Sequence, residues 1–303
     1  MESISRRTYL QQMAGLAMLP FIPSWLMQSK HILTRPVPGT AEQLPVIGLG
    51  TWQTFDVGEA QAEREPLKEV LKVLFDHGGS VIDSSPMYGR SEKVVGELST
   101  EVKLNEKFFM ATKVWTNGKD NGIRQMNESF TLLKRKHIEL MQIHNLVDWQ
   151  THLKTLRDWK AQGKIKYIGI THYTESAYAS LEQILKTEAI DFLQINYSLL
   201  SRKAEERLFP LCMEKQVAVL VNQPFESGNL FNRMRGKDLP AWAKDFDCAS
   251  WGQFFLKFIL SHPAVTCVIP GTSKPHHMLD NLGAGFGKLP DEQQRQEMIK
   301  LIA

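Results

Sequence analysis

Four residues able to exchange protons each lie at or just past the end of a short apolar run: Asp83, Tyr88, Lys113 and His144. They offer a carboxylate, a phenol, an ammonium and an imidazole, which together can move a proton to or from a carbonyl or alcohol oxygen. A phenol has an ordinary pKa of about 10, so a nearby cation that lowers this pKa would help it act at neutral pH. The four residues can cooperate only if the chain brings their runs together.

The apolar runs predict where these residues meet. Eight runs of strand length, rich in Val and Ile, have the pattern of strands that are buried on both faces. If they are successive strands of a parallel barrel, their carboxyl ends meet at one mouth and the four residues converge there. The runs cover residues 45–52, 80–85, 108–115, 138–145, 165–173, 192–200, 217–225 and 266–273.

Amphipathic stretches between the runs predict helices. Apolar stripes at helical spacing occur within residues 67–74, 123–133 and 177–185. Eight alternations of strand and helix with no linker between them indicate one (β/α)8 barrel, a fold that typically needs about 250 residues. A doubly wound sheet is the alternative, but Gly48 and Gly50 lack the third glycine of the dinucleotide fingerprint.

Two further segments carry predictions. Short runs at residues 31–36 and 44–48 predict a β-hairpin that plugs the floor of the barrel. The connection over residues 225–248 is too long for an ordinary link, so we expect a lid or binding loop that could cover a dinucleotide. The candidate cofactor-binding residues of this loop are Ser227, Gly228 and Leu230.

Composition excludes several kinds of partner. The chain has 303 residues, of which 43% are hydrophobic and 23% charged, enough to bury a large core. Its net charge of +3 is modest and its basic residues are scattered, so we expect no nucleic-acid partner. The three cysteines lack metal-site spacing and their odd number argues against a disulfide framework. We expect no bound metal, and a monomer is the default.

The first 31 residues differ from the rest. Residues 5–10 read S-R-R-T-Y-L, and the apolar stretch at 13–27 has the length of a signal-peptide core but is too short for a membrane span. This segment resembles a twin-arginine export signal, which implies the export machinery as a partner and a periplasmic location. The alternative is a basic segment that packs on the barrel of a cytoplasmic protein. We divide the chain into a signal segment, residues 1–31, and a barrel, residues 32–303.

Each of the four residues also has a structural explanation when it is considered alone. Asp83 and Lys113 could form a purely structural ion pair, since a buried carboxylate needs a partner. Tyr88 could be a surface tyrosine and His144 a hydrogen-bonded core histidine. Four such coincidences on successive elements are rarer than one shared site, so the sequence favours a site.

Seven motifs then occur in a consistent order along the chain. They are GLGTW at 48–52, VIDSSPMYGRSE at 81–92, TKVW at 112–115, QIHN at 142–145, GITH at 169–172, LQINY at 193–197 and IPGTSKPHHMLDNLGA at 269–284. Each is weak alone, but their order and spacing resemble the aldo/keto reductase family. The resemblance extends over nearly all of residues 33–303.

The resemblance implies an NAD(P)H-dependent reductase of aldehydes or ketones. Tyr88 would protonate the carbonyl oxygen while the nicotinamide delivers hydride to carbon. Lys113 would lower the pKa of Tyr88, and Asp83 would orient Lys113. His144 would hydrogen-bond the substrate oxygen and fix its direction. The residues expected to line an apolar pocket for the carbonyl substrate are Trp52, Met87 and Trp115.

The resemblance also implies how the nucleotide is held. Thr171, His172 and Gln194 would bind the nicotinamide carboxamide, by analogy with the family's Ser, Asn and Gln. The C-terminal motif would contribute further cofactor-binding residues, namely Gly271, Thr272, Ser273, Lys274, His277 and Asn281. NADP(H) is the family default and the expected cofactor, with NAD(H) as the alternative.

Two departures from the family pattern concern the nucleotide. The seventh strand of the family commonly ends in Y-S-P-L, with an aromatic ring on the nicotinamide, whereas residues 221–225 of this chain have no ring at that place. Tyr197 or Phe225 could substitute for it. Two cations that often clamp a 2′-phosphate are replaced, and His277 lacks the bidentate fork of arginine.

Two other classes of function stay open. One is a nucleotide-binding relative with residual or regulatory redox activity, which the altered seventh strand and the export-like N-terminus favour. The other is a hydrolytic or metal-dependent barrel that uses Asp83, His144 and His172, although these residues lack metal-ligand spacing.

Overall fold

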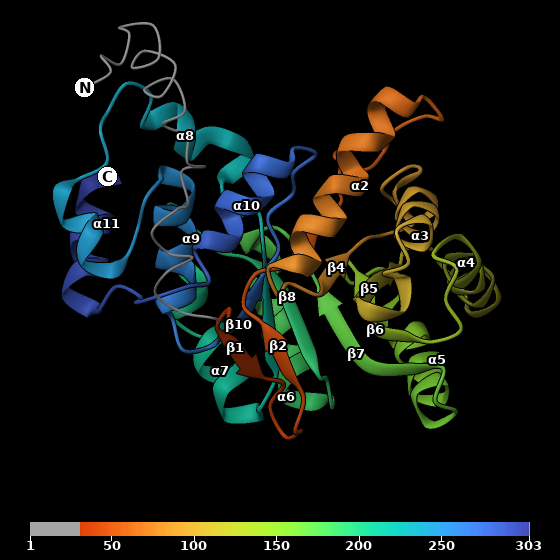
Figure 1. The fold of residues 1–303 in the computed structure, drawn as a ribbon. Coiled ribbons are helices and arrows are strands. Elements are labelled where there is room, and N and C mark those ends of the chain that lie inside the picture. The colour runs from red at the N-terminus through yellow and green to blue at the C-terminus, as the bar shows by residue number, and fades with distance from the viewer. Residues whose placement is uncertain (1–30, 303) are drawn as a thin grey trace, which may run out of the picture.

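The computed structural model describes residues 31–302, and a sheet of eight parallel strands forms its centre (Figure 1). The strands are β3 (Leu49–Gly50), β4 (Val81–Asp83), β5 (Phe109–Val114), β6 (Ile138–His144), β7 (Ile165–Thr171), β8 (Phe192–Asn196), β9 (Ala218–Asn222) and β10 (Val265–Val268). They pair in chain order from β3 to β10. Each predicted run overlaps one of these strands, so the (β/α)8 fold is confirmed.

The sheet closes on itself where β3 meets the end of β10. The amide of Gly50 donates to the carbonyl oxygen of Pro270 at 3.2 Å, and a parallel bridge pairs Gly50 with Gly271. A Cβ atom on Gly50 would lie 2.7 Å from the carbonyl oxygen of Ile269, so only glycine allows this close approach. Closure brings the first and last strands of the motif series together at the mouth.

A helix follows every strand of the barrel and covers its outer surface (Figure 1). The helices are α2 (Gln61–Asp76), α3 (Ser91–Glu101), α4 (Lys119–Leu132), α5 (Trp149–Ala161), α6 (Tyr178–Thr187), α7 (Leu208–Lys215), α8 (Asn229–Arg233), α9 (Trp251–Ser261), α10 (Pro275–Gly283) and α11 (Glu292–Ile302). The stripe predicted in α2 is fully buried, since Leu67, Val70, Leu71 and Leu74 each have 0% exposure. Apolar burial of this kind attaches each helix to the sheet.

An antiparallel hairpin lies at one end of the barrel (Figure 1). Its strands are β1 (Thr34–Pro36) and β2 (Gln43–Pro45). Val37 and Leu44 share a buried cluster with inward-facing barrel residues such as Tyr167 and Phe192. Arg35 anchors the hairpin by donating to backbone carbonyls at the end of α9 and the start of β10. The hairpin therefore fills the floor of the barrel, as predicted.

The connection from β9 to β10 carries extra structure before α9. It contains the 3-10 segment η5 (Glu226–Gly228), the short helix α8 and the 3-10 segment η6 (Ala241–Phe246). Ser227 has a positive φ of 52° and Gly228 one of 89°, so the chain turns sharply as it leaves β9. This turn keeps the start of the connection at the mouth of the barrel.

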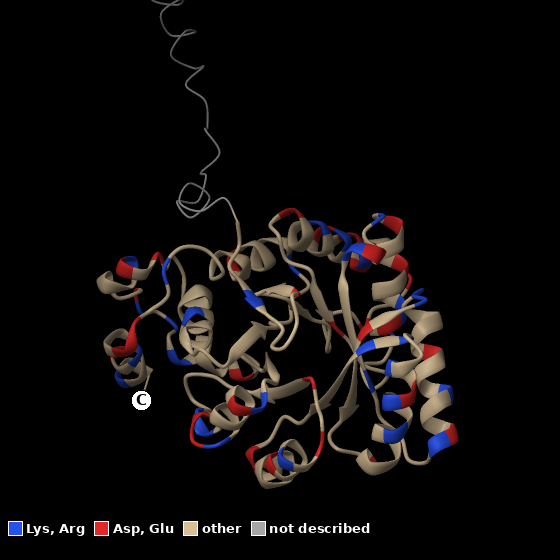
Figure 2. Cartoon of the chain, turned by 90° about the horizontal axis from the view of Figure 1, so that it is seen from below, with Lys and Arg blue, Asp and Glu red and all other residues tan. Residues whose placement is uncertain are grey.

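Charges of both signs alternate along the outer helices (Figure 2). The three cysteines are buried and unpaired. Across residues 31–302, no helix combines the length and the apolar character needed to cross a membrane. The predicted export signal, residues 1–31, falls outside the described residues except for its last position, and it stays a prediction.

Candidate active site

The barrel register brings the four proton-exchanging residues to one mouth. Asp83 ends β4, Lys113 lies in β5 and His144 ends β6. Because β4 pairs with β5 and β5 with β6, these residues stand on neighbouring strands. Tyr88 lies in the loop between β4 and α3, and its ring centroid is 5.9 Å from that of His144. The structure thus places all four residues together.

A buried ion pair joins Lys113 to Asp83. The ammonium Nζ donates to Asp83 Oδ2 at 2.6 Å and to the carbonyl oxygen of Ser84 at 2.7 Å. Gln142 Nε2 donates to the other carboxylate oxygen, Asp83 Oδ1, at 3.0 Å. The two charged side chains are 0% and 3% exposed, so either charge alone would be strongly destabilising. Burial lowers the pKa of Lys113, but Asp83 and Tyr88 outweigh it and the net shift is upward.

The same ammonium lies over the ring of Tyr88, with Nζ 4.7 Å from the ring centroid. Burial raises the pKa of Tyr88, whereas the charge of Lys113 lowers it, and the net shift is upward from 10.0. Lys113 acts in the expected direction, but desolvation of the phenolate determines the result. The phenol is therefore protonated at neutral pH, which is the form that can donate a proton.

His144 faces the cavity in a neutral state. Burial, followed by the charge of Lys113, lowers the pKa of His144 from 6.5 to about 3. Its Nδ1 lies 3.0 Å from the hydroxyl of Ser85, which is fully buried. A neutral imidazole has one donor nitrogen and one acceptor nitrogen. The contact at Nδ1 therefore influences whether the other nitrogen, Nε2, is a donor or an acceptor.

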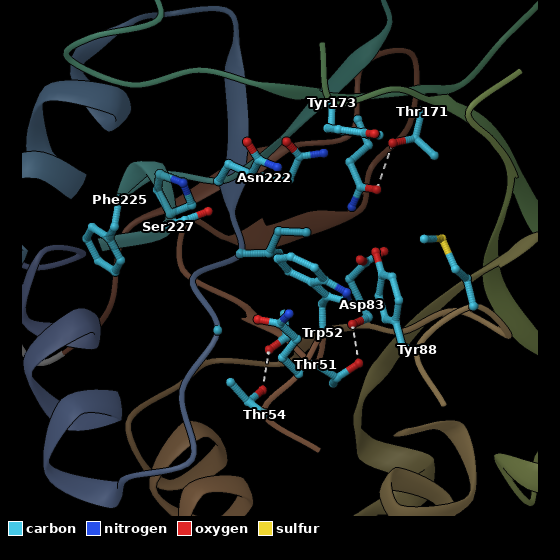
Figure 3. Close-up of a pocket in the computed structure, with 18 of the residues that line it drawn as sticks. Thr51, Trp52, Thr54, Asp83, Tyr88, Thr171, Tyr173, Asn222, Phe225 and Ser227 are labelled. Atoms are coloured by element: carbon cyan, nitrogen blue, oxygen red, sulfur yellow. Dashed lines mark hydrogen bonds between the residues drawn. The ribbon is translucent and has the colours of Figure 1, made fainter. Parts of the chain in front are cut away.

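Asp83, Tyr88 and His144 open into a cavity of about 620 Å³, a volume typical of small-molecule sites. In Figure 3, Asp83 and Tyr88 lie on one side of Trp52, and Phe225 and Ser227 on the other. Its apolar and aromatic lining consists of Trp52, Met87, Pro224, Phe225, Phe231 and Ile269. Its polar lining besides Asp83, Tyr88 and His144 consists of Thr51, Gln53, Thr54, Asn145, Thr171, Tyr173, Gln194, Asn222, Gln223 and Ser227.

Two amide side chains of the wall fit a ligand that carries a carboxamide. Thr171 Oγ1 donates to Gln194 Oε1 at 2.9 Å, which holds the Gln194 amide in place (Figure 3). Gln194 is 1% exposed, and its Nε2 has no partner among the described residues. The Oδ1 atom of Asn222, at the end of β9, is likewise buried without a partner. Leaving such a group unpaired costs about 1–3 kcal/mol, so a ligand that pairs with it gains affinity.

Outside the C-terminal motif, two predicted cofactor residues, His172 and Leu230, do not line the cavity. Leu230 is fully buried in the hydrophobic core. The Nδ1 atom of His172 accepts from the backbone amides of Tyr173 and Thr174, and Tyr173 lines the cavity in its place. His172 therefore stabilises the loop in which it lies. Within residues 31–302, no group of His, Cys, Asp and Glu side chains is arranged to hold a metal ion.

The C-terminal motif reaches the cavity through Ile269 and Gly271. Lys274 caps the start of α10, and its side chain is exposed there together with that of His277. Thr272 and Asn281 are buried. The members of the predicted set that do not line the cavity are Thr272, Ser273, Lys274, His277 and Asn281. Thr272, Ser273 and Lys274 directly follow the cavity residue Gly271 and lead into the N-terminus of α10, whose free N–H groups favour an anion.

Only some of the predicted substrate-binding residues line the cavity. Trp52 and Met87 line the cavity, whereas Trp115 does not. Trp115 is 41% exposed, and its ring centroid is 6.3 Å from that of His144. It stands at the rim beside the imidazole.

Of the two proposed substitutes for the missing stacking ring, only Phe225 lines the cavity. Tyr197 is fully buried, and its hydroxyl contacts Glu205 and Arg295 inside the protein. Tyr197 is therefore a core residue, and the prediction that it could serve as the ring is wrong.

Sequence reasoning missed several residues of the site. Ser85, Asn145 and Tyr173 each lie one or two positions beyond the last residue of a strand. In a parallel barrel these positions form the mouth, so their place after β4, β6 and β7 was a usable signal. Their individual contacts depend on loop conformations that sequence patterns do not specify.

Comparisons with known proteins identify the family that this chain resembles. The model of the aldo/keto reductase family matches residues 46–298. Methylglyoxal reductase YeaE of Escherichia coli (strain K12) is 28% identical over 245 residues, which cover 78% of this chain and 84% of that protein. The NADH-specific methylglyoxal reductase of the same organism is 26% identical over 243 residues, covering 69% and 72%. A Klebsiella pneumoniae aldo/keto reductase, crystallised with NADP and acetate, superimposes with a TM-score of 0.74 at 23% identity, over 88% of this chain and 94% of that one.

Replacing Asp83 by Asn should lower the free energy of unfolding by about 3–5 kcal/mol, because it leaves the Lys113 ammonium buried without a counter-ion. Lys113→Met should cause a comparable loss. The double variant should recover much of it, since no unpaired charge then remains. Urea denaturation followed by circular dichroism measures all three.

An exposed ion pair provides the control. Lys93 Nζ lies 2.9 Å from Glu59, with side chains 46% and 75% exposed. Lys93→Met should change the free energy of unfolding by less than about 1 kcal/mol. Strictly additive losses in the Asp83 and Lys113 double variant would contradict the coupling described here.

Proposed function

The chain belongs to the aldo/keto reductase family, and from this premise we propose that it reduces the carbonyl group of an aldehyde or ketone to an alcohol. Membership of the family makes it an oxidoreductase. The observation that carries the proposal is the position of Lys113 Nζ, which contacts both the Asp83 carboxylate and the ring of Tyr88 at the cavity.

Tyr88 acts as the general acid. Its phenol is protonated at neutral pH, since burial raises its pKa. Tyr88 gives its proton to the carbonyl oxygen as negative charge develops there, and the adjacent Lys113 ammonium stabilises the phenolate that remains. Asp83 holds the Lys113 side chain in place and keeps the amine charged.

His144 orients the substrate. The neutral imidazole lines the cavity with its ring edge-on to Tyr88, so both can approach one carbonyl oxygen. A hydrogen bond from His144 to that oxygen directs the carbonyl toward the phenol. Since the imidazole is neutral and not an imidazolium, it does not compete with Tyr88 as the acid.

A reduced nicotinamide dinucleotide supplies the hydride, and we propose NADP(H). Gln194 and Asn222 offer an unpaired donor and an unpaired acceptor to the carboxamide, with Thr171 holding Gln194. Ser227 borders the same cavity, and exposed Lys274 offers a cation to the phosphates beside Gly271. NADP is named in the Klebsiella pneumoniae complex. NADH is the alternative, because one Escherichia coli relative is named as NADH-specific.

The cavity favours an uncharged carbonyl substrate. None of the described residues that line it is Lys or Arg. Asp83 and Lys113 compensate each other, so a carboxylate on the substrate would be desolvated without a counter-ion. Two Escherichia coli relatives are named methylglyoxal reductases, and methylglyoxal is a neutral aldehyde. We therefore propose neutral aldehydes of this kind as substrates.

Replacing Tyr88 by Phe should lower kcat for methylglyoxal reduction at least about a hundredfold, because the proton donor is lost. Oxidation of NADPH at 340 nm measures the rate. Tyr167→Phe is the control, since it removes a tyrosine hydroxyl at the floor of the barrel and should preserve turnover. Undiminished turnover by the Tyr88 variant would remove this residue from the mechanism.

Nucleotide binding separates loss of chemistry from loss of the fold. Titrations of NADPH and of NADH by fluorescence quenching should give the same dissociation constants for the wild type and the Tyr88→Phe variant. NADPH should bind the more tightly of the two. Tighter binding of NADH would make NADH the cofactor, and the role of Tyr88 as the general acid would not be affected.

Methylglyoxal and glyoxylate test the charge preference. Both contain an aldehyde, which lies beside a neutral acetyl group in methylglyoxal and beside a carboxylate in glyoxylate. We expect kcat/KM for glyoxylate to be lower at least about tenfold, owing to the cost of burying its charge. The free aldehyde fraction of each compound must be used, since both are hydrated in water. Equal kcat/KM values for the two compounds would show that the cavity stabilises the carboxylate of glyoxylate, against this proposal.

A further inference from the structure

His144 can donate a hydrogen bond to a carbonyl oxygen in only one of its two neutral forms. A neutral imidazole carries its proton on Nδ1 or on Nε2, and only the protonated nitrogen is a donor. Nδ1 faces Ser85 at 3.0 Å, which leaves Nε2 for the cavity that His144 lines. The hydrogen bond at Nδ1 therefore decides whether Nε2 is a donor or an acceptor.

The contacts of Ser85 identify which hydrogen bond this is. Its side chain has 0% exposure, and its Oγ accepts from the backbone N–H of Met87 at 3.2 Å. Among the described residues, the other polar contact of Oγ is His144 Nδ1. A hydroxyl has one proton to donate, and a buried donor without an acceptor is costly. The proton of the Ser85 hydroxyl therefore points to Nδ1.

We propose that Ser85 is a positioning residue that fixes the tautomer of His144. Ser85 donates to Nδ1, so the imidazole proton resides on Nε2 and is available to the carbonyl oxygen of the substrate. In the opposite tautomer, Nε2 would present a lone pair to that oxygen and repel it. The inference rests on the proposed carbonyl reduction and specifies how one of its residues is prepared.

The turn that carries Tyr88 also holds Ser85. The carbonyl oxygen of Ser85 accepts from the amide of Tyr88 at 3.0 Å, while its Oγ accepts from the amide of Met87. Ser85 thus closes the turn with its backbone and orients the imidazole with its side chain. One short segment after β4 sets the positions of both the acid and the orienting group.

The doubly protonated form of His144 does not compete with this arrangement at neutral pH. Burial and the charge of Lys113 lower the pKa of His144 to about 3. Only the two neutral tautomers are then populated, and Ser85 selects between them.

Long-range nitrogen–proton correlation NMR on the full-length protein, labelled with ¹⁵N-histidine, reads the tautomer directly. The chain has nine histidines, and the signals of His144 are those lost in His144→Gln. The wild type should show the proton on Nε2. Ser85→Ala should show a mixture of both tautomers, whereas Ser85→Thr, which keeps the hydroxyl, should retain the wild-type form.

Kinetics provide the second readout. Ser85→Ala should lower kcat for methylglyoxal reduction about tenfold, with the dissociation constant for NADPH unchanged. Ser85→Thr should restore most of the rate. Ser99→Ala removes an equally buried hydroxyl on α3, away from the cavity, and should alter neither the tautomer nor kcat.

Two results would overturn the proposal. The first is a wild-type spectrum with the proton on Nδ1. The second is a Ser85→Ala variant whose His144 keeps the wild-type tautomer; a loss of kcat in that variant would then give Ser85 a packing role alone. If the wild type reduced no carbonyl, the proposed function would fail, while the NMR comparison would still decide what Ser85 does.

Discussion

The removal of the Lys113 ammonium from water is the constraint on which the rest of the site depends. Its side chain is fully buried in β5, and the charge is tolerable only because Asp83 Oδ2 lies 2.6 Å away. That contact requires β4 to end beside β5 in one register, with Asp83 opposite Ala111. The same register places the ammonium over the ring of Tyr88. A single contact thus satisfies the electrostatics of the barrel and prepares its proton donor.

Burial acts in opposite directions on the two uncharged groups of the mouth. It raises the pKa of Tyr88 and lowers that of His144, so both are neutral at physiological pH. Tyr88 is then the acid, because it keeps its proton at neutral pH. Its conjugate base, the phenolate, is stabilised by the charge of Lys113 beside it. Since the charges of Asp83 and Lys113 compensate each other, the cavity offers little attraction to an anionic substrate. Reactivity and substrate preference therefore share one physical origin.

The sequence predicted the barrel and the convergence of the four residues because both follow from periodicity. Apolar runs of strand length and their order are local properties, and a parallel barrel places every strand end at the same mouth. Predictions based on analogy with the family differ in outcome: Thr171 and Gln194 line the cavity, whereas His172 Nδ1 accepts from its own loop and Tyr197 lies in the core. The role of Ser85 was not accessible, because it depends on a turn that brings its hydroxyl to His144. Net pKa shifts also require burial, which sequence patterns do not give.

The pH dependence of kcat/KM for carbonyl reduction tests the central claim most directly. Tyr88 must be protonated and His144 neutral, so kcat/KM should be constant from pH about 5 to 9 and fall only near or above the ordinary tyrosine value of about 10. Glu92 is buried, which raises its pKa to about 7, and Glu92→Gln removes any contribution from that carboxyl. A loss of kcat/KM with a midpoint below pH 8 that persists in Glu92→Gln would contradict a buried, protonated Tyr88 as the acid.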